Sequence, residues 1–204
     1  MPADDLSKGE RTQSKILAAA HQQFLLNGYH GASMRQIAQN AGIAPGSIYN
    51  HFASKEDIFL AVLFAHHPIN DILPAMRAAQ ADSIETFVRG AAQRMVQSID
   101  NRPDFLNLLF IELVEFNGRH LNTLFGRIFP QVVEAAQPFV QNNSQLRDLP
   151  LPILVRAFIG LFFSYVMTQI MLKDQLSDGD RYKDFDHFVD IYLHGILKPA
   201  SNQA

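Results

Sequence analysis

The segment Ser33–Phe52, SMRQIAQNAGIAPGSIYNHF, constrains the fold of this chain more than any other. Apolar residues recur at helical spacing from Met34 to Ala41, which predicts a short helix. Gly42 follows and supplies the positive φ that ends a helix without a steric penalty. A second helix is expected to begin at Pro45, because the N–H that proline lacks would be unpaired in a first turn. The segment therefore predicts two short helices joined by a tight turn.

The second of these helices is expected to have one apolar and one polar face. Ile48 and Phe52 lie four residues apart and therefore share the apolar face. A helix-turn-helix places such a helix in the major groove of DNA, where amide and hydroxyl side chains reach base edges and phosphates. An ordinary helical hairpin with a polar outer face is the alternative interpretation. The residues left for the polar face are Gly46, Ser47, Tyr49, Asn50 and His51.

A longer stretch resembles the TetR family of bacterial transcriptional regulators. ILAAAHQQFLLNG, from Ile16 to Gly28, precedes GASMRQIAQNAGIAPGSIYNHFASKEDIF in the order and spacing of that family's amino-terminal domain. The resemblance covers about the first quarter of the 204 residues, and the remainder is similar only in helical character, length and layout. No strand pattern appears, so we expect an all-α fold of about nine helices. The resemblance implies a three-helix helix-turn-helix DNA-binding domain over residues 1–54 and a helical effector-binding and dimerisation domain over residues 55–204.

The same resemblance implies a set of DNA contacts. Ser33 is expected to cap its helix, with Gln36 completing a capping box, and exposed amides at such a helix start attract phosphate. Lys55 is a cation at the positive start of the next helix, a position that favours a neighbouring anion such as a DNA phosphate. Tyr49 and His51 are expected on phosphates, and Gly46, Ser47 and Asn50 nearest the base edges. The predicted set is Ser33, Arg35, Pro45, Gly46, Ser47, Tyr49, Asn50, His51 and Lys55.

Ala44 departs from the family pattern, in which a hydroxyl residue is common at this cap and a basic residue often follows. The missing cap is expected to weaken the helix start by about 1 kcal/mol, and the preset φ of Pro45 offsets part of that loss. Two alternatives stay open for the DNA-contact set. Arg35 is either a DNA contact or a solvated surface residue, and His51 is either a phosphate contact or a buried, hydrogen-bonded histidine.

Composition places limits on the kind of protein. The net charge is −3, and up to Asp57 five basic residues face five acidic ones, so bulk charge does not indicate nucleic-acid binding. The chain has no Cys, which excludes disulfides and Cys-based metal sites and suits a reducing cytoplasm. The polar start MPADDLSKGERTQSK lacks the pattern of an export signal. We therefore expect a cytoplasmic protein.

Two apolar segments near the carboxy terminus are predicted to form helices. Arg156 and Lys173 bracket only sixteen residues of the first, Leu151–Leu172, which argues against a membrane span. The second is expected over Tyr182–Leu197. In the family the last two helices pair with those of a second subunit in a four-helix bundle, which implies a homodimer; burial within one chain is the alternative. The predicted interface residues are Ala157, Gly160, Ser164, Thr168, Phe188 and Tyr192.

The resemblance also implies a pocket for a small apolar effector. Glu112 and Glu115 lie within an apolar segment, where unpaired buried carboxylates are costly. They are expected to pair with arginines such as Arg94 or Arg156, to lie on a solvent-facing edge, or to contact a polar group of a ligand. Apolar residues at helical spacing are equally typical of a plain core. The candidate wall residues are Phe110, Leu113, Phe116, Phe125, Phe129, Phe162, Tyr165, Met167 and Gln169.

Catalysis has little support in the sequence. None of the six glutamates has a histidine three residues later, as helical di-metal sites require, and no phosphate loop or hydrolase nucleophile motif is present. A metal site among Asp184, His187, Asp190 and His194 stays open. We predict a non-enzymatic homodimer without cofactor, a repressor that a small apolar effector releases from a palindromic operator in double-stranded DNA. A constitutive DNA-binding dimer, and a helical carrier or enzyme with a vestigial DNA-binding head, are the alternatives.

Overall fold

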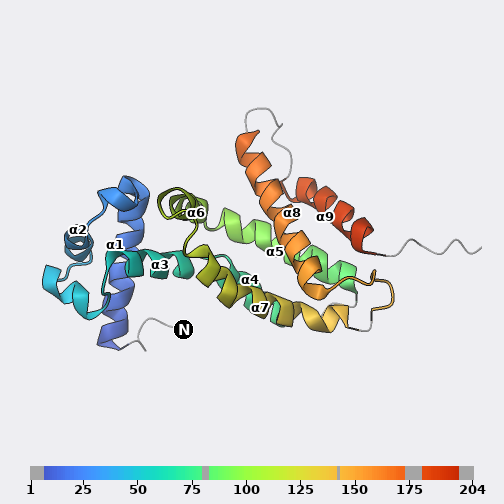
Figure 1. Cartoon of the computed structure of the whole chain (residues 1–204), viewed down its shortest axis with the longest axis horizontal. Helices are drawn as coiled ribbons and strands as arrows, with labels where there is room; N and C mark the ends of the chain where they lie inside the picture. Colours follow the sequence, from blue (N-terminus) through green and yellow to red (C-terminus); the bar gives the residue numbers. More distant parts are fainter. Residues whose placement is uncertain (1–6, 80–82, 142, 173–180, 198–204) are drawn as a thin grey trace, which may run out of the picture. The chain divides into compact units, whose positions relative to one another are not determined.

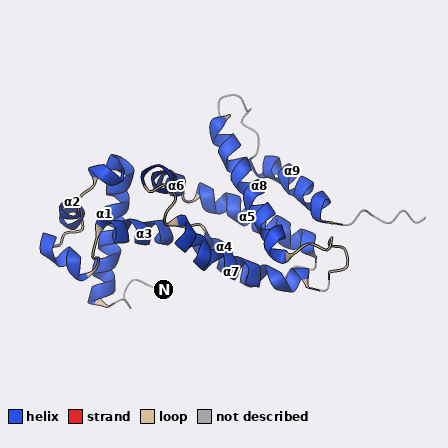
Figure 2. Ribbon diagram, viewed as in Figure 1, coloured by secondary structure: helices blue, strands red, loops and turns tan. Residues whose placement is uncertain are grey.

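The structure, a computed structural model, describes residues 7–79, 83–141, 143–172 and 181–197. These residues form nine α-helices and one 3-10 helix, with a single isolated bridge between Leu146 and Leu197 in place of any strand (Figures 1 and 2). The prediction of an all-α fold with about nine helices is confirmed. The chain separates into two compact units, which we call the first and the second unit.

The first unit comprises Met1–His67 and Arg102–Phe125. The amino-terminal helices therefore share one compact unit with α6, which comes much later in the chain. The predicted functional boundary after residue 54 stays a prediction, since this unit also includes the helix that follows it. Its elements are α1 (Lys8–Gly31), α2 (Met34–Asn40), the 3-10 helix η2 (Pro45–Asn50), α3 (Lys55–Ala65), α6 (Asp104–Glu115) and the start of α7 (Leu121–Val140).

The turn between α2 and η2 forms as the sequence predicts. Gly42 has φ +69°, a left-handed conformation that side chains other than glycine rarely adopt. Ser33 caps α2, since its Oγ accepts the N–H of Gln36 at 3.3 Å. The capping box differs from the prediction, because the Gln36 side chain accepts from the Ser33 hydroxyl at 2.6 Å rather than from the Ser33 backbone N–H.

The predicted second helix of this motif is shorter and tighter than expected. It is a 3-10 helix that ends at Asn50, not an α-helix through Phe52. Ala44 stands at its start without a side-chain cap, as the sequence indicates, and the Ser47 N–H donates to the Ala44 carbonyl at 2.9 Å. A 3-10 helix is usual for so short a piece, because its i to i+3 bonds close within few residues.

The core of the first unit holds η2 in place. Ile48 of η2 is fully buried and Phe52, just after η2, is 7% exposed, so both side chains face inward as predicted. Phe24 meets Phe59 in a T-shaped, edge-to-face arrangement at 5.3 Å between ring centroids, and Phe59 stacks on Phe116 at 5.0 Å. The other fully buried side chains of this core are Ile16, Ala20, Ile37, Ala38, Ile58, Val62, Leu63 and Leu108.

The second unit comprises Pro68–Asn101 and Gly126–Ala204. Phe185 and Val189 of its last helix are buried in its core, and Tyr165 packs on Phe185 at 4.7 Å between centroids. Its elements are α4 (Ile69–Arg77), α5 (Ile84–Asp100), the rest of α7, α8 (Leu151–Met171) and α9 (Arg181–Ile196).

Proline usually bends or ends a helix, but three prolines of the second unit lie inside helices that continue past them. The chain leaves α3 before Pro68, whereas Pro74 lies inside α4. Pro130 and Pro138 lie inside α7, which is one element and is not split. Within the described ranges, α8 alone is long and apolar enough to cross a bilayer, a property that core helices of soluble proteins share.

The glycine turn predicts unequal effects of two matched substitutions. A Cβ at Gly42 or at Gly46 would meet no other atom within 4 Å, so any difference between them comes from the backbone. Gly42→Ala is expected to destabilise the protein by about 1–2 kcal/mol, because alanine disfavours positive φ. Gly46→Ala should be neutral or stabilising by about 0.4–1 kcal/mol, since it restricts the unfolded chain. Thermal unfolding of both variants checks this, and equal transition temperatures would contradict it.

Candidate nucleic-acid interface

The predicted DNA-contact residues all lie in the first unit, and most face solvent. Tyr49 is 59% exposed, and Asn50 beside it is exposed as well, because buried Ile48 fixes the orientation of η2. His51 is partly exposed, which contradicts the alternative of a buried histidine. Of the remaining residues, those exposed are Ser33, Arg35, Pro45 and Gly46, and those partly exposed are Ser47 and Lys55.

This surface lies in a stretch of the chain without acidic residues. From Arg11 to Lys55 the sequence contains no Asp and no Glu, while four Lys or Arg side chains occur in it. The balance of five basic and five acidic residues conceals this feature, because every acidic side chain counted lies outside the stretch. Local clustering of positive charge, not the sum, attracts a phosphate backbone. Charge mapped along the chain would have given this signal from the sequence.

Lys55 has partners that the sequence did not reveal. Its Nζ donates to the carbonyls of Tyr29 at 2.6 Å and of Ala32 at 2.7 Å, and it lies 4.2 Å from the centroid of the Tyr29 ring. Burial lowers the pKa of Lys55, and the charge of Glu115 opposes that effect. The negative partner expected beside this cation is therefore the carbonyl end of α1. A phosphate contact through its third N–H stays a prediction.

Glu115 holds the same turn from the other side. Its Oε1 accepts the Tyr29 N–H at 3.3 Å, so Tyr29 has partners for both its backbone N–H and its backbone carbonyl. Its Oε2 lies 3.4 Å from His30 Nε2, an ion pair when the histidine is protonated. Gly28 has φ +68° and ends the regular part of α1, and a Cβ there would lie 3.3 Å from Glu115 Oε1. The predicted arginine partner is wrong for Glu115, since a backbone amide and a histidine take that place.

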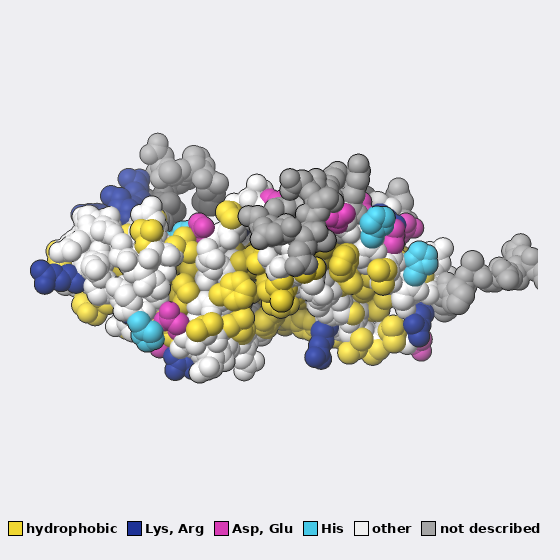
Figure 3. Space-filling model, turned by 90° about the horizontal axis from the view of Figure 1, so that it is seen from above, with side chains coloured by type: hydrophobic (Ala, Val, Ile, Leu, Met, Phe, Trp, Pro, Cys, Tyr) yellow, Lys and Arg dark blue, Asp and Glu magenta, His cyan; other side chains and the backbone are white. Residues whose placement is uncertain are grey.

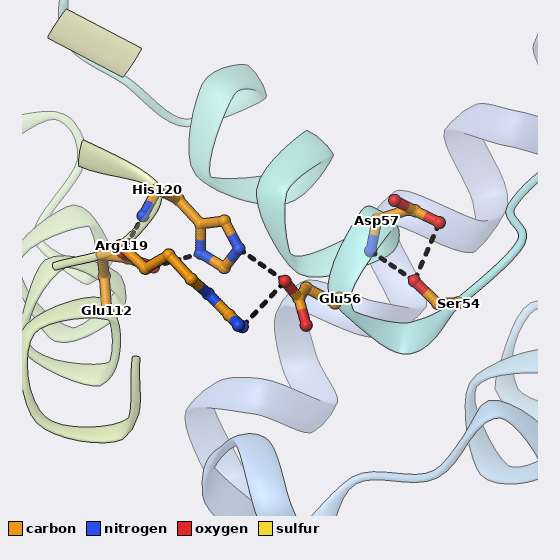
Figure 4. Close-up of polar contacts among 6 residues, drawn as sticks. All are labelled: Ser54, Glu56, Asp57, Glu112, Arg119 and His120. Atoms are coloured by element: carbon orange, nitrogen blue, oxygen red, sulfur yellow. Dashed lines mark hydrogen bonds and ion pairs between the residues drawn. The ribbon is translucent and has the colours of Figure 1, made fainter. Parts of the chain in front are cut away.

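Glu112 is fully buried and belongs to a polar cluster that joins α6, the turn after it and α3 (Figure 4). It accepts the His120 N–H at 2.7 Å and lies 2.8 Å from His120 Nδ1. Glu56 Oε1 lies 2.9 Å from His120 Nε2 and accepts from Arg119 Nη2 at 2.8 Å. Arg94 and Arg156, the partners predicted for Glu112, do not take that place; His120 does. A histidine eight residues later satisfies the carboxylate.

The candidate effector-wall residues do not gather in one unit. Phe116 is 8% exposed and packs on Tyr29 at 4.5 Å, so it is core, as the alternative held. Tyr165 is core as well, at 3% exposure. Phe110, Leu113 and Phe125 of the first unit are 41%, 39% and 46% exposed. The candidates that are partly exposed in the second unit are Phe129, Phe162, Met167 and Gln169.

The predicted dimer-interface residues lie on α8 and α9. Ala157, Gly160 and Ser164 are exposed, so this stripe of small residues is not core of the single chain. Thr168 and Phe188 are partly exposed, while the Tyr192 hydroxyl donates to the Leu154 carbonyl at 2.9 Å and so joins the two helices. Hydrophobic side chains gather on the surface of the second unit (Figure 3). The large exposed ones on α8 and α9 are Ile153, Phe163, Ile170, Met171 and Ile191.

The open metal site on α9 gains no support. Across the described ranges, no group of three His, Asp or Glu side chains is placed to hold a metal ion. Asp190 instead pairs with Arg89 at 2.5 Å, which joins α9 to α5. His194 Nδ1 contacts the Asp190 carbonyl at 2.7 Å.

The hydrogen bonds of Lys55 to Tyr29 and Ala32 predict that this residue stabilises the fold even when no DNA is bound. Lys55→Met keeps the length of the side chain but leaves the carbonyls of Tyr29 and Ala32 without their donor. We expect a loss of about 1–2 kcal/mol of stability, below the full value of a charged hydrogen bond because solvent screens a partly exposed group. Lys15→Met, at an exposed lysine of α1, is the matched control. Equal urea midpoints for the two variants would contradict this role.

The amino-terminal part of the chain is the part that resembles known proteins most in sequence. Residues 16–62 match the family model described as bacterial regulatory proteins, tetR family. The regulator UidR of Escherichia coli K12 is 40% identical over 57 residues, which are 28% of this chain and 29% of UidR. The transcriptional activator FasR of Mycolicibacterium smegmatis is 29% identical over 132 residues, 62% of this chain and 52% of FasR. The match thus spans less than a third of UidR and about half of FasR.

Solved structures extend the likeness to the rest of the fold. The regulator FadR of Bacillus subtilis, in complex with stearoyl-CoA, superimposes with a TM-score of 0.68 at 19% identity, over 90% of this chain and 98% of FadR. At that identity the likeness shows the fold alone. The sequence match places residues 16–62 in the TetR family of bacterial regulatory proteins, and the likeness to FadR shows that the chain as a whole has a similar fold.

Proposed function

We propose that this protein is a DNA-binding transcriptional regulator that acts in the cytoplasm as a homodimer. The observation that carries the proposal is the polar face of η2, on which Tyr49 and Asn50 are exposed while Ile48 beneath them is fully buried. The surrounding stretch without acidic residues favours approach to a phosphate backbone. In this arrangement Tyr49, His51 and Ser33 contact phosphates, and Gly46, Ser47 and Asn50 lie nearest the base edges.

Dimerisation supplies the second copy of this surface. The exposed small residues Ala157, Gly160 and Ser164 allow the α8 of another subunit to approach closely, and the apolar side chains around them favour burial. Two copies of η2 would then enter successive major grooves about 34 Å apart on a palindromic operator.

A small apolar effector controls the affinity in our proposal. FadR, which shares the fold, was solved with stearoyl-CoA, so compounds with a long acyl chain are the first class to test. The effector lowers DNA affinity only as far as it binds the released form more tightly than the DNA-bound form. We propose repression as the output; FasR is an activator, so the direction is a separate question for experiment.

Substitutions on η2 test the docking surface. On duplex DNA carrying the region upstream of the gene, Tyr49→Ala should weaken binding to all sequences, because it removes a phosphate contact. Asn50→Ala should also relax sequence preference, by about 1–3 kcal/mol at the base pair it reads. Asn122→Ala, at an exposed asparagine of α7, is the matched control. Gel retardation with specific and unrelated duplexes measures both effects, and wild-type affinity in both η2 variants would overturn the docking surface.

Addition of stearoyl-CoA tests the effector class. We expect it to release the wild-type protein from DNA, whereas CoA without an acyl chain leaves the complex intact, because binding of the acyl chain is driven by burial of apolar surface. The same titration followed by fluorescence anisotropy of the labelled duplex gives the apparent affinity. Release by CoA alone would contradict an apolar effector. Unchanged DNA binding throughout would favour the constitutive dimer over this class of effector.

A further inference from the structure

The polar cluster of Glu112, His120 and Glu56 contains one proton fewer than its contacts require when the histidine is neutral. His120 lies between two carboxylates, with Nδ1 2.8 Å from Glu112 Oε2 and Nε2 2.9 Å from Glu56 Oε1. A neutral imidazole has a single N–H and donates to one of them only. Both contacts are hydrogen bonds only when the cluster holds an additional proton.

Glu112 fixes where that proton acts. Its carboxylate is fully buried and also accepts the His120 backbone N–H at 2.7 Å. With the additional proton on the imidazole, Nδ1–H donates to Glu112 and Nε2–H donates to Glu56. Without the proton, Nδ1–H stays with buried Glu112, and the lone pair of Nε2 faces the Glu56 carboxylate. That contact then becomes repulsive.

We propose that His120 is a proton-dependent positioning residue for DNA binding, whose protonated form fastens the first turn of α3 to the turn after α6. This inference rests on the proposed function. Glu56 follows Lys55, whose ammonium holds the carbonyls of Tyr29 and Ala32. Ala32 directly precedes Ser33, the cap of α2. Fastening Glu56 therefore fixes the contacts that lead to the proposed DNA surface.

Other groups near His120 do not replace this contact. Arg119 binds Glu56 from the surface, where its side chain is 61% exposed, and such exposed pairs contribute little. The Phe116 ring packs on the imidazole at 4.7 Å between centroids, and it carries no charge. The Tyr29 phenol faces Glu56 and Arg119; burial raises its pKa, so it stays neutral in the relevant range. When His120 loses its additional proton, the exposed Arg119 is thus the remaining partner of Glu56 among these groups.

The direction of the pH dependence follows from the balance at His120. Burial lowers the pKa of His120, but hydrogen bonds to Glu112 and Glu56 outweigh burial and raise it above the ordinary value of about 6.5. A raised value in the folded state contributes stability that is fully present below about pH 6.5 and is lost as the pH rises through the raised value. The fastened form therefore predominates on the acidic side.

Glu56→Gln separates this proton effect from the contact itself. The glutamine amide donates to neutral Nε2 from the position of Glu56 Oε1, so the contact with His120 survives without the additional proton. Arg119, which shares that oxygen in the wild type and is exposed, then turns to the glutamine carbonyl oxygen or to solvent. Glu85→Gln is the matched control, because Glu85 also lies in the first turn of its helix and pairs with an arginine, Arg89, but contacts no histidine. All measurements use the full chain.

The first measurement needs no DNA. Hydrogen exchange at the amides of residues 56–60, corrected for intrinsic rates, is followed between about pH 6 and 8 with the NMR titration of the His120 ring. In the wild type and in Glu85→Gln, protection should fall as the ring loses its proton, and in Glu56→Gln it should stay constant. Titration of the ring with unchanged protection in the wild type would overturn the fastening, as would equal profiles in all three proteins.

The second measurement connects the contact to DNA. On the upstream duplex, wild type and Glu85→Gln should lose affinity as the pH rises, by at most about tenfold per pH unit, the limit for one coupled proton. Glu56→Gln should lose less than either. The same pH dependence in all three proteins would overturn the positioning role. A wild type that binds no DNA at any pH would contradict the proposed function instead, and the exchange result then decides whether His120 fastens α3.

Discussion

The burial of Ile48 and Phe52 is the interaction on which the proposed DNA surface depends. A helix of six residues is far too short to be stable alone in water, so tertiary packing must hold η2. Those two side chains provide that packing and thereby leave the polar side of η2 outside. The aromatic core of Phe24, Phe59 and Phe116 continues it into α1, α3 and α6. The buried side chains of residues 45–52 thus determine which side chains of the same segment are exposed to form the proposed DNA surface.

Local features of the fold were predictable because their causes are local. Gly42 and the cap Ser33 act through the backbone within a few residues, and both stand where the sequence indicates. Prolines were less informative. A proline inside a helix removes one hydrogen bond, and packing around α4 and α7 outweighs that cost at the three positions where it occurs. The spacing of apolar residues predicts a helix at η2 but does not distinguish a short 3-10 helix from a short α-helix.

Partners between distant helices could not be read in this way. Glu112 and Glu115 were correctly identified as carboxylates needing partners, but the choice of His120, His30 and a backbone amide depends on which turns come together in the first unit. Proximity along the chain did not suggest α1 as the neighbour of Lys55 either. The stretch without acidic residues from Arg11 to Lys55, in contrast, can be read directly from the sequence. The net charge up to Asp57 conceals it, because the acidic residues on either side cancel the basic ones.

The geometry around Lys55 also makes two cations unequal at this position. An ammonium directs its N–H bonds tetrahedrally, so it can bond to two carbonyls at 2.6 and 2.7 Å and still keep one donor for a third acceptor. A guanidinium presents its donors in a flat, rigid fork. Arginine would preserve the charge and lose that distribution of bonds. At this position, exchange of lysine for arginine, usually regarded as the mildest change among basic residues, would therefore alter the hydrogen bonding at the end of α1.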